Sequence, residues 1–184
     1  NLVDRLLAPY RTGRSLSDIN IHEVLERVRQ IILAEFPKGL SFIRDYDVSV
    51  PTLRGDREQL LQVFLNIEKN AAEALDGKIA EGTAEIRVIT RVAQQVQIGL
   101  RRYRLALSIH IQDNGPGVPP EIRDRIFYPL VTGKANGSGL GLSLAQNFIR
   151  QHDGSIDVES EPGKTDFRIL LPLSPPETGD ISPA

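Results

Sequence analysis

The sequence contains no cysteine, methionine or tryptophan, and only 5% of its 184 residues are aromatic. The absence of cysteine excludes disulfides and thiolate zinc sites, and it suits a cytoplasmic protein. No apolar run is long enough to span a bilayer. A formal net charge of −2 argues against a nucleic-acid binder, whose surface is usually basic. We therefore expect a globular domain, with a core of Leu, Ile, Val and Ala, that contacts neither membrane nor nucleic acid.

The residues that are present fit one domain of a longer protein. Hydrophobic residues make up 40% of the chain and charged residues 25%, which is ordinary for a globular domain. The chain begins at Asn1 without a methionine, and apolar residues at helical spacing follow as far as Leu7. We expect residues 1–16 to be the end of an upstream helix and a linker, and residues 17–174 to form one domain. Residues 175–184 have the composition of a disordered tail.

Apolar periodicity predicts an α+β fold with two layers, in which a mixed, mostly antiparallel sheet packs against about three helices. Asp56 is expected to cap the second helix, with Gln59 placed as in a capping box. Gly154 is expected to end the third helix as its C′ residue. A short helix is expected after Pro119-Pro120. The main helices are expected at 20–36, at 56–75 and after the glycine-rich segment 133–141; strands are expected at 40–47, 84–93, 103–113, 155–160 and 165–173, with a polar, basic connection between 93 and 103 and a hairpin at the end.

One stripe of the 56–75 helix carries amides. Gln62, Asn66 and Asn70 follow one another at a spacing of four residues, with Lys69 and Glu73 on their flanks. Asparagine has a poor helix propensity, and a solvated face normally carries Lys and Glu instead. An amide oxygen is a hard, neutral ligand that suits Mg²⁺. The stripe is therefore either a solvated face or a metal-binding one.

A glycine-rich segment immediately precedes the last predicted helix. Gly137, Gly139 and Gly141 alternate there, and the exposed N–H groups of a helix start can bind phosphate. The segment is not a Rossmann fingerprint, because Leu142 stands where glycine or alanine is required. It is not a Walker A loop either, because neither Ser nor Thr follows Gly133-Lys134. A flexible linker and a phosphate-binding segment of another type remain as interpretations.

The stretch SIHIQDNGPGVPPEI, residues 108–122, ends a strand in a turn rich in glycine and proline. Such steps are ordinary turn chemistry, because Gly allows positive φ and Pro presets its own φ. Alternatively, the turn fixes the carboxylate of Asp113 at the strand end, where it can accept a hydrogen bond from the exocyclic amine of adenine. Guanine carries a carbonyl oxygen at that position and would be rejected.

The order of these three features resembles the GHKL, or Bergerat, ATP-binding fold of sensor histidine kinases and related ATPases. The resemblance covers roughly residues 17–174, and its four boxes read QVFLNIEKNAAEAL, DNGPGVP, IFYPLVTGK and GSGLGLSLAQNFI. It implies that the chain binds ATP and Mg²⁺, with Asn70 as the metal ligand and Asp113 as the group that reads adenine. The other residues that it implies at the nucleotide are Asn66, Lys69, Gly115, Gly117, Lys134, Gly137, Gly139, Leu140, Gly141 and Thr165.

Position 66 distinguishes the kinases of this family from the members that hydrolyse ATP. The hydrolysing members carry a glutamate four residues before the metal-binding asparagine, and this chain has Asn66 there. An amide cannot accept a proton at neutral pH, so we expect slow hydrolysis. Glu68 is placed on the wrong face of the helix to replace that glutamate. The resemblance therefore implies a histidine kinase; the alternatives are a GHKL ATPase, a serine-directed anti-sigma-type kinase and a regulator-docking module.

The segments YRLALSIHIQDNGPGVP and FYPLVTGK resemble nitrogen-regulation kinases of the NtrB type. This resemblance implies an NtrC-like response regulator and a PII-type signal protein as partners, and a homodimeric full-length protein. Glu73 replaces the Lys or Arg that is frequent in other kinases, and residues 163–167 lack one glycine of the usual last box. Both departures fit the nitrogen-regulation subgroup.

A phosphoacceptor histidine is not recognisable in this chain. His22, His110 and His152 lack the flanking residues of an acceptor motif, and we expect each of them to have a structural role. The resemblance implies that the acceptor lies upstream of Asn1, on a separate dimerisation domain of the same kinase.

Overall fold

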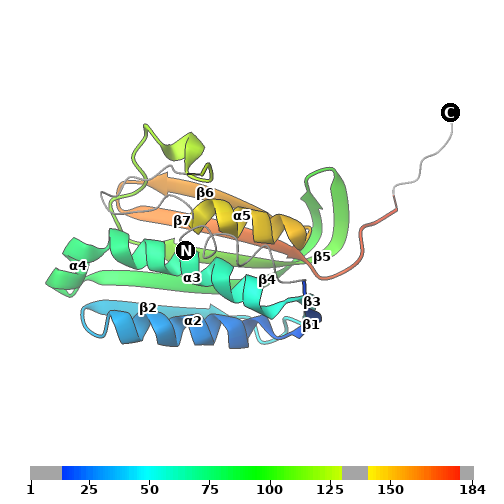
Figure 1. The fold of residues 1–184 in the computed structure, drawn as a ribbon, viewed down its shortest axis with the longest axis horizontal. Coiled ribbons are helices and arrows are strands. Elements are labelled where there is room, and N and C mark those ends of the chain that lie inside the picture. Colours follow the sequence, from blue (N-terminus) through cyan, green and yellow to red (C-terminus); the bar gives the residue numbers. More distant parts are fainter. Residues whose placement is uncertain (1–13, 130–140, 179–184) are drawn as a thin grey trace, which may run out of the picture.

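The computed structural model describes residues 14–129 and 141–178, and these build a two-layer α/β sandwich (Figure 1). Three long helices lie over one face of a five-stranded sheet, which confirms the predicted fold class. Their buried apolar side chains form one core with the facing residues of the sheet. Within the described residues, none of the helices combines the length and apolar composition needed to cross a bilayer. The helices are α2 (Ile21–Glu35), α3 (Arg57–Ala74), the short α4 (Asp76–Glu81), a 3-10 turn η1 (Arg123–Arg125) and α5 (Gly141–Gln151).

The sheet has the strand order β2-β4-β5-β7-β6. Strand β2 runs parallel to β4, and all the other neighbours are antiparallel, so the sheet is mixed and mostly antiparallel as predicted. Strand β5 is central and ends at Asp113, which places this residue at the middle of one end of the sheet. The strands are β2 (Leu40–Tyr46), β4 (Ala84–Ile98), β5 (Arg101–Asp113), β6 (Ser155–Glu161) and β7 (Lys164–Pro172).

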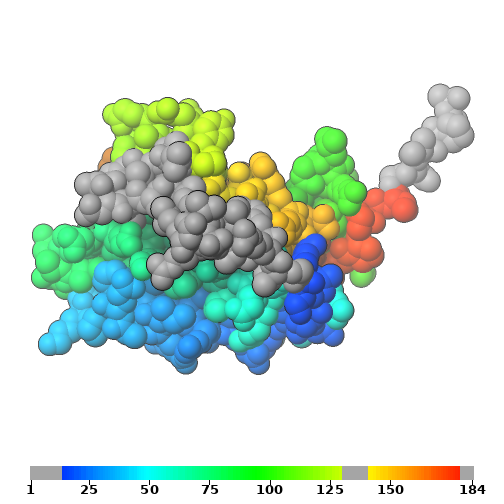
Figure 2. Space-filling model, in the orientation of Figure 1, coloured from blue at the N-terminus to red at the C-terminus, as the bar shows by residue number. Residues whose placement is uncertain are grey.

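The connection expected between residues 93 and 103 is instead a continuation of both strands. β4 and β5 stay paired as far as Ile98 and Arg101, so only Gly99 and Leu100 form the turn. Gly99 has a φ of +61°, which suits the first central position of a type II′ hairpin turn. In Figure 2 this hairpin is the green lobe that projects beside the C-terminal segment. The prediction of a loop was wrong here because the strands have no Asn-Gly or Asp-Gly signal to mark their turn.

Two short strands, which the apolar pattern did not predict, form a separate ribbon. β1 (Leu16–Ile19) pairs antiparallel with β3 (Leu53–Asp56), just before the starts of α2 and α3 respectively. Four residues are too few to show a periodicity of two, so this ribbon had no readable signal.

The segment expected to be a tail, residues 175–184, begins with residues that pair with the sheet. Pro176 forms a β-bridge with Tyr103, and the backbone N–H of Glu177 donates to the carbonyl oxygen of Arg102 at 2.7 Å. The described part of this segment, residues 175–178, therefore runs beside β5 close to the turn of the β4–β5 hairpin.

The start of α3 is tied to the end of α5. Asp56 Oδ1 accepts the backbone N–H of Gln59 at 3.1 Å, as the sequence predicted for a capping residue. The reciprocal half of a capping box is not formed: the Asp56 N–H donates to His152 Nε2 at 2.9 Å. The amide of Gln59 instead donates to Gln151 Oε1 at 3.1 Å. Tertiary partners on α5 thus replace the local bond that the capping-box pattern implied.

Glycine is required at position 154 by close packing, not by the left-handed φ that was predicted for it. The left-handed residue after α5 is Asp153, with a φ of +58°. Gly154 donates its backbone N–H to the carbonyl oxygen of Ile149 at 2.9 Å. A Cβ on Gly154 would lie 2.4 Å from the carbonyl oxygen of Leu170, so the close approach of β7 excludes a side chain there. The helix ends where the sequence predicted, but by another backbone geometry.

Candidate functional site

Asp113 closes strand β5, and its side chain is almost completely buried. It is 7% exposed and stands, in the register of the sheet, between Ile86 on β4 and Thr165 on β7. Its Oδ1 accepts the backbone N–H of Gly115 at 2.9 Å. Burial raises the pKa of the Asp113 carboxyl from 3.8 to about 6, and the Gly115 N–H opposes this rise. The carboxyl group is therefore fixed in position and changes charge close to neutral pH.

Geometry requires both glycines of the turn after Asp113. A Cβ on Gly115 would lie 2.8 Å from Asp113 Oδ1 and would displace the carboxylate. A Cβ on Gly117 would lie 2.7 Å from the carbonyl oxygen of Glu161, and Gly117 also has a φ of +88°. Side chains rarely adopt that φ, and the contact would add a steric clash. Gly115 and Gly117 thus allow the turn that holds Asp113.

Asn114 also holds this turn, although it was not among the predicted site residues. Its Oδ1 accepts the backbone N–H of Glu85 at 2.8 Å, and its Nδ2 donates to the carbonyl oxygen of Thr83 at 2.9 Å. Both bonds tie the turn to the start of β4. The only sequence signal is an asparagine before a glycine, which is typical of turns in general.

Thr165 lies beside Asp113 on the neighbouring strand and is 5% exposed. Its hydroxyl is 3.0 Å from Ser160 Oγ, and Ser160 Oγ accepts the backbone N–H of Val118 at 2.7 Å. Through Ser160, Thr165 is therefore linked to the residue that follows the turn. Ser160 is a second supporting residue that the sequence analysis missed, because a serine in an alternating strand carries no distinguishing pattern.

Asn66, the middle residue of the amide stripe on α3, contacts α5. Gln62 Nε2 donates to Asn66 Oδ1 at 2.5 Å, and Asn66 Nδ2 donates to the carbonyl oxygen of Gly141 at 3.0 Å. Gly141 is the first residue of α5. Asn66 therefore joins α3 to the point where the glycine-rich segment enters the last helix.

The stripe and the turn border the same region. A Cβ on Gly115 would lie 3.4 Å from Leu75 Cδ2 and 3.7 Å from the carbonyl oxygen of Ala74, so the turn lies against the C-terminal end of α3. Asn70 lies on α3 between this end and Asn66, and it is half-buried. The structure thus brings the asparagines of α3, the Asp113 turn and the start of α5 together along one side of α3.

Lys69 and Glu68 lie on other faces of α3. The Lys69 Nζ is 3.7 Å from Glu35 Oε1 of α2, an exposed ion pair that directs this side chain away from Gly141. Glu68 is fully buried, and neither of its carboxyl oxygens has a hydrogen-bond partner among the described residues. Burial raises the pKa of Glu68 well above 4.5, and the carboxylate of Glu26 adds to the rise. Burial therefore favours the neutral form of Glu68, and its position in the core agrees with the prediction that it lies on the wrong face.

Four of the residues that the resemblance implies at the nucleotide lie outside the described part of the chain; they are Lys134, Gly137, Gly139 and Leu140. Gly141 is described, and a Cβ on it would lie 3.8 Å from side-chain atoms of Asn66, an ordinary contact. Packing against α3 alone therefore does not require glycine at position 141.

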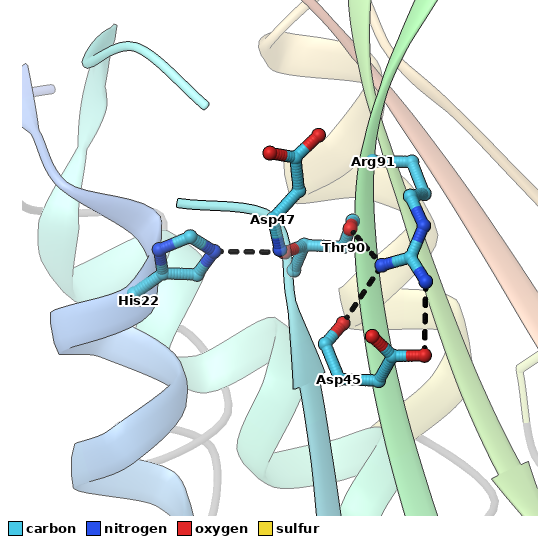
Figure 3. A network of polar contacts seen from close by, with 5 residues as sticks. All are labelled: His22, Asp45, Asp47, Thr90 and Arg91. Atoms are coloured by element: carbon cyan, nitrogen blue, oxygen red, sulfur yellow. Dashed lines mark hydrogen bonds and ion pairs between the residues drawn. The ribbon is translucent and has the colours of Figure 1, made fainter. Parts of the chain in front are cut away.

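Figure 3 shows the surroundings of His22, where a polar network joins α2 to the parallel pair β2–β4. His22 Nε2 lies 2.8 Å from Thr90 Oγ1, which also accepts the backbone N–H of Asp47 at 3.0 Å. Beside it, Arg91 donates to the carboxylate of Asp45 at 2.9 Å. This histidine connects two layers of the fold, in line with the structural role expected for it.

The other two histidines are also engaged within the fold. His110 Nδ1 is 3.0 Å from the carboxylate of Asp166 on the adjacent strand. His152 Nδ1 donates to the carbonyl oxygen of Phe148 at 2.7 Å, while its Nε2 accepts the Asp56 N–H. This pair of bonds requires the neutral imidazole, and burial lowers the pKa of His152 accordingly.

Comparison with known proteins identifies the class to which this fold and site belong. The sequence profile of the family described as "Histidine kinase-, DNA gyrase B-, and HSP90-like ATPase" matches residues 55–175, which is more than half of the chain. The chain belongs to this family. Within it, the chain is similar to proteins named sensory histidine kinase/phosphatase NtrB: it is 49% identical over 173 residues to that of Salmonella typhimurium and 44% identical over 167 residues to that of Rhodobacter capsulatus.

These two matches cover 94% and 88% of this chain, but 48% and 45% of the relatives. The chain therefore spans about half the length of the curated relatives that it matches. Solved structures agree on the fold. Full-length ShkA, described as in complex with AMPPNP, has a TM-score of 0.73 at 24% identity, covering 94% of this chain and 35% of that one. The catalytic domain of the histidine kinase ThkA has a TM-score of 0.69 at 23% identity, covering 86% of this chain and 95% of that one.

Proposed function

We propose that this chain binds ATP with Mg²⁺ and acts as the catalytic domain of a two-component histidine kinase of the NtrB type. The observation that carries the proposal is the buried carboxyl of Asp113, fixed by its turn beside the asparagines of α3 and the start of α5. Membership of the family and similarity to NtrB proteins support the same function. In this proposal the chain supplies the nucleotide, and another domain supplies the acceptor histidine.

Adenine is recognised by Asp113. Because Gly115 occupies Oδ1 of the carboxylate, Oδ2 is the oxygen assigned to the exocyclic amine of adenine. A guanine base would present its carbonyl oxygen to the same carboxylate, which is repulsive in a buried setting. Thr165 and Asn114 keep the carboxylate and its turn in place.

The donor set of α3 fits Mg²⁺ bound together with a nucleotide. The amide oxygen of Asn70 is a neutral, hard ligand, and Mg²⁺ usually takes few protein ligands beside phosphate and water oxygens. Among the described residues there is no group of three His, Cys, Asp or Glu side chains that could hold a metal ion by themselves. Asn70 would thus hold the ion against the phosphates, where the ion would neutralise their charge. Lys134, Gly137, Gly139, Leu140 and Gly141 are assigned to the phosphates. Lys69 would have to leave its ion pair with Glu35 to contact them.

Phosphoryl transfer is favoured over hydrolysis because α3 offers water no base at position 66, where the hydrolysing members of the family carry a glutamate. Position 66 carries an amide, and both ends of that amide are already used by Gln62 and Gly141. The nearest acid on the helix, Glu68, is buried on the opposite face. The acceptor imidazole would be the nucleophile, and this chain would contribute positioning and charge neutralisation.

The proposed partners of this kinase follow from its assignment to the NtrB type. They are the dimerisation domain that carries the histidine, an NtrC-like response regulator and a PII-type protein, in a homodimeric cytoplasmic kinase. ThkA, a histidine kinase of similar fold, has been solved in complex with the response regulator TrrA.

Transfer in trans tests the proposal. The purified chain is incubated with Mg²⁺ and γ-labelled ATP, with and without the histidine-bearing dimerisation domain of the Salmonella typhimurium relative. The expected label is on the dimerisation domain, requires the chain, and disappears when the acceptor histidine of that domain is replaced. Label on the chain alone, or rapid release of inorganic phosphate instead of transfer, would contradict the proposal.

A further inference from the structure

Gln62 has no role in the proposed chemistry, yet it starts a chain of hydrogen bonds that ends at the start of α5. Its Nε2 donates to Asn66 Oδ1 at 2.5 Å, and Asn66 Nδ2 donates to the carbonyl oxygen of Gly141 at 3.0 Å. Both side chains are half-buried between α3 and α5. The first bond stays within α3, and the second crosses to the other helix.

The donors and acceptors available fix the direction of these two hydrogen bonds. A backbone carbonyl can only accept, so Asn66 must turn its NH₂ group toward Gly141. The oxygen of the Asn66 amide must then face Gln62, and Gln62 must offer its own NH₂ group to it. Without a donor at position 62, the Gly141 carbonyl alone would orient the Asn66 amide. A side chain with only acceptors at that position would repel the Asn66 oxygen and favour the flipped amide, whose oxygen would meet the Gly141 carbonyl.

The two ends of α5 are held by separate contacts. At its end, Gln151 accepts from Gln59, and His152 accepts the backbone N–H of Asp56. At its start, the bond from Asn66 is the only hydrogen bond from α3 to Gly141 described by the structure. The glycine-rich segment joins the helix at this residue. A change at Gln62 would therefore act on the start of α5 and leave its end in place.

We propose that Gln62 is a positioning residue for the nucleotide phosphates: by orienting the amide of Asn66, it fixes the first residue of α5. This inference rests on the proposed function, in which the start of α5 faces the phosphates. Gln62 acts through Asn66 and does not touch the nucleotide. A Gln–Asn pair one turn apart also stabilises its own helix slightly, so a test has to separate nucleotide binding from stability.

Three substitutions carry the test in the chain of residues 1–184, with ADP and Mg²⁺ as the probe in titration calorimetry. Gln62→Met keeps the length of the side chain and removes the donor, and Gln62→Glu keeps the shape but offers only acceptors. Loss of one hydrogen bond corresponds to about a threefold to tenfold weaker ADP affinity. We expect that loss for Gln62→Met, a larger one for Gln62→Glu, and melting temperatures without nucleotide close to that of the wild type. Gln151→Glu adds the same charge on α5 and keeps its acceptor oxygen for Gln59, so its ADP affinity should equal that of the wild type.

A double-mutant cycle decides whether Gln62 acts through Asn66. When Asn66→Ala is already present, adding Gln62→Met should weaken ADP binding no further, because the amide to be oriented is gone. Independent losses that multiply in the double variant would overturn the inference, as would an unchanged ADP affinity in Gln62→Met. A Gln62→Met chain that loses stability but binds ADP normally would assign Gln62 to the helix alone and would also overturn it. If the wild-type chain binds no ADP or ATP, the proposed function itself fails, which is a separate and distinguishable result.

Discussion

The backbone N–H of Gly115 donates to Asp113 Oδ1 at 2.9 Å, so the residue that turns the chain away from β5 also holds the carboxylate that ends the strand. A side chain at position 115 would collide with that same oxygen. The glycine and the acid therefore form one unit, in which the turn exists to place the carboxylate.

Binding of ATP should depend on pH through Asp113. Its folded pKa is about 6 and lies above the usual 3.8, so the carboxylate that accepts from adenine is formed only as the pH rises through about 6. We expect ATP affinity to increase across that range in calorimetric titrations at constant ionic strength. Stability has the opposite sign: the folded state binds this proton more tightly, so the contribution of Asp113 falls by about 3 kcal/mol between pH 4 and 6. Asp113→Asn should remove both dependences, and an ATP affinity that is flat from pH 5 to 7 in the wild type would contradict the account.

Replacing Glu68 with leucine should stabilise the protein. The buried carboxyl has no hydrogen-bond partner among the described residues, and its polar atoms cost free energy that an apolar side chain of similar size would not. We expect the free energy of unfolding in urea to rise by about 1–3 kcal/mol at pH 7. The matched change Glu58→Leu, at an exposed position of the same helix, should change it by less than about 1 kcal/mol. A raised folded pKa also means that stability falls as the pH rises above 4.5, and Glu68→Leu should abolish this part of the pH profile. Destabilisation by Glu68→Leu would show that the carboxyl has a partner that matters.

Alanine substitutions at Gly117 and Gly163 form a matched pair that tests why the turn after Asp113 requires glycine. Both have a positive φ, of +88° and +92°, but only Gly117 lacks room for a Cβ; the structure places no described atom within 4 Å of a Cβ on Gly163. Gly163→Ala should cost about 1 kcal/mol, the usual penalty for the backbone alone. Gly117→Ala adds the clash with Glu161 and should cost about 2–4 kcal/mol in urea unfolding, together with weaker ATP binding. Equal costs for the two variants would mean that the contact with β6 relaxes easily.

A glutamate at position 66 should convert slow hydrolysis into faster hydrolysis. Asn66→Glu places a base where the hydrolysing members of the family carry one, and general-base catalysis contributes about 10²–10⁴-fold. Glutamate cannot donate to the Gly141 carbonyl, so ATP affinity should fall at the same time, and the release of phosphate must be measured at saturating ATP. Gln151→Glu is the charge control and should leave the rate unchanged. Brisk hydrolysis by the wild-type chain would contradict the assignment of Asn66.

The layers of the fold were predictable because their signals are local and repeated. The helix 21–35 carries apolar residues at helical spacing through Val24, Val28 and Ile32, and all three lie in the core. In the strands around Ile86 and Ile109, apolar residues recur at every second position of the sequence instead. Such patterns record burial on one face, which the sheet and helices then satisfy.

The parts that could not be predicted depend on contacts between distant segments. His152 replaces Gln59 as the partner of the Asp56 N–H, a choice that only the packing of α5 on α3 decides. In the candidate site, Asp113, Gly115 and Gly117 were recognisable because their spacing is specific. Asn114 was not, because its hydrogen bonds go to residues 29 and 31 positions upstream, which no local pattern indicates.

Selectivity for adenine tests the central claim most directly. ATP and GTP are titrated separately into the wild-type chain with Mg²⁺ at pH 7.5, and into Asp113→Asn and the exposed control Asp157→Asn. Wild type and Asp157→Asn should bind ATP at least about tenfold more tightly than GTP, and Asp113→Asn should lose at least that factor in ATP affinity, since a hydrogen bond to a charged group is at stake. Equal binding of ATP and GTP by the wild type, or an ATP affinity that survives Asp113→Asn unchanged, would contradict the account.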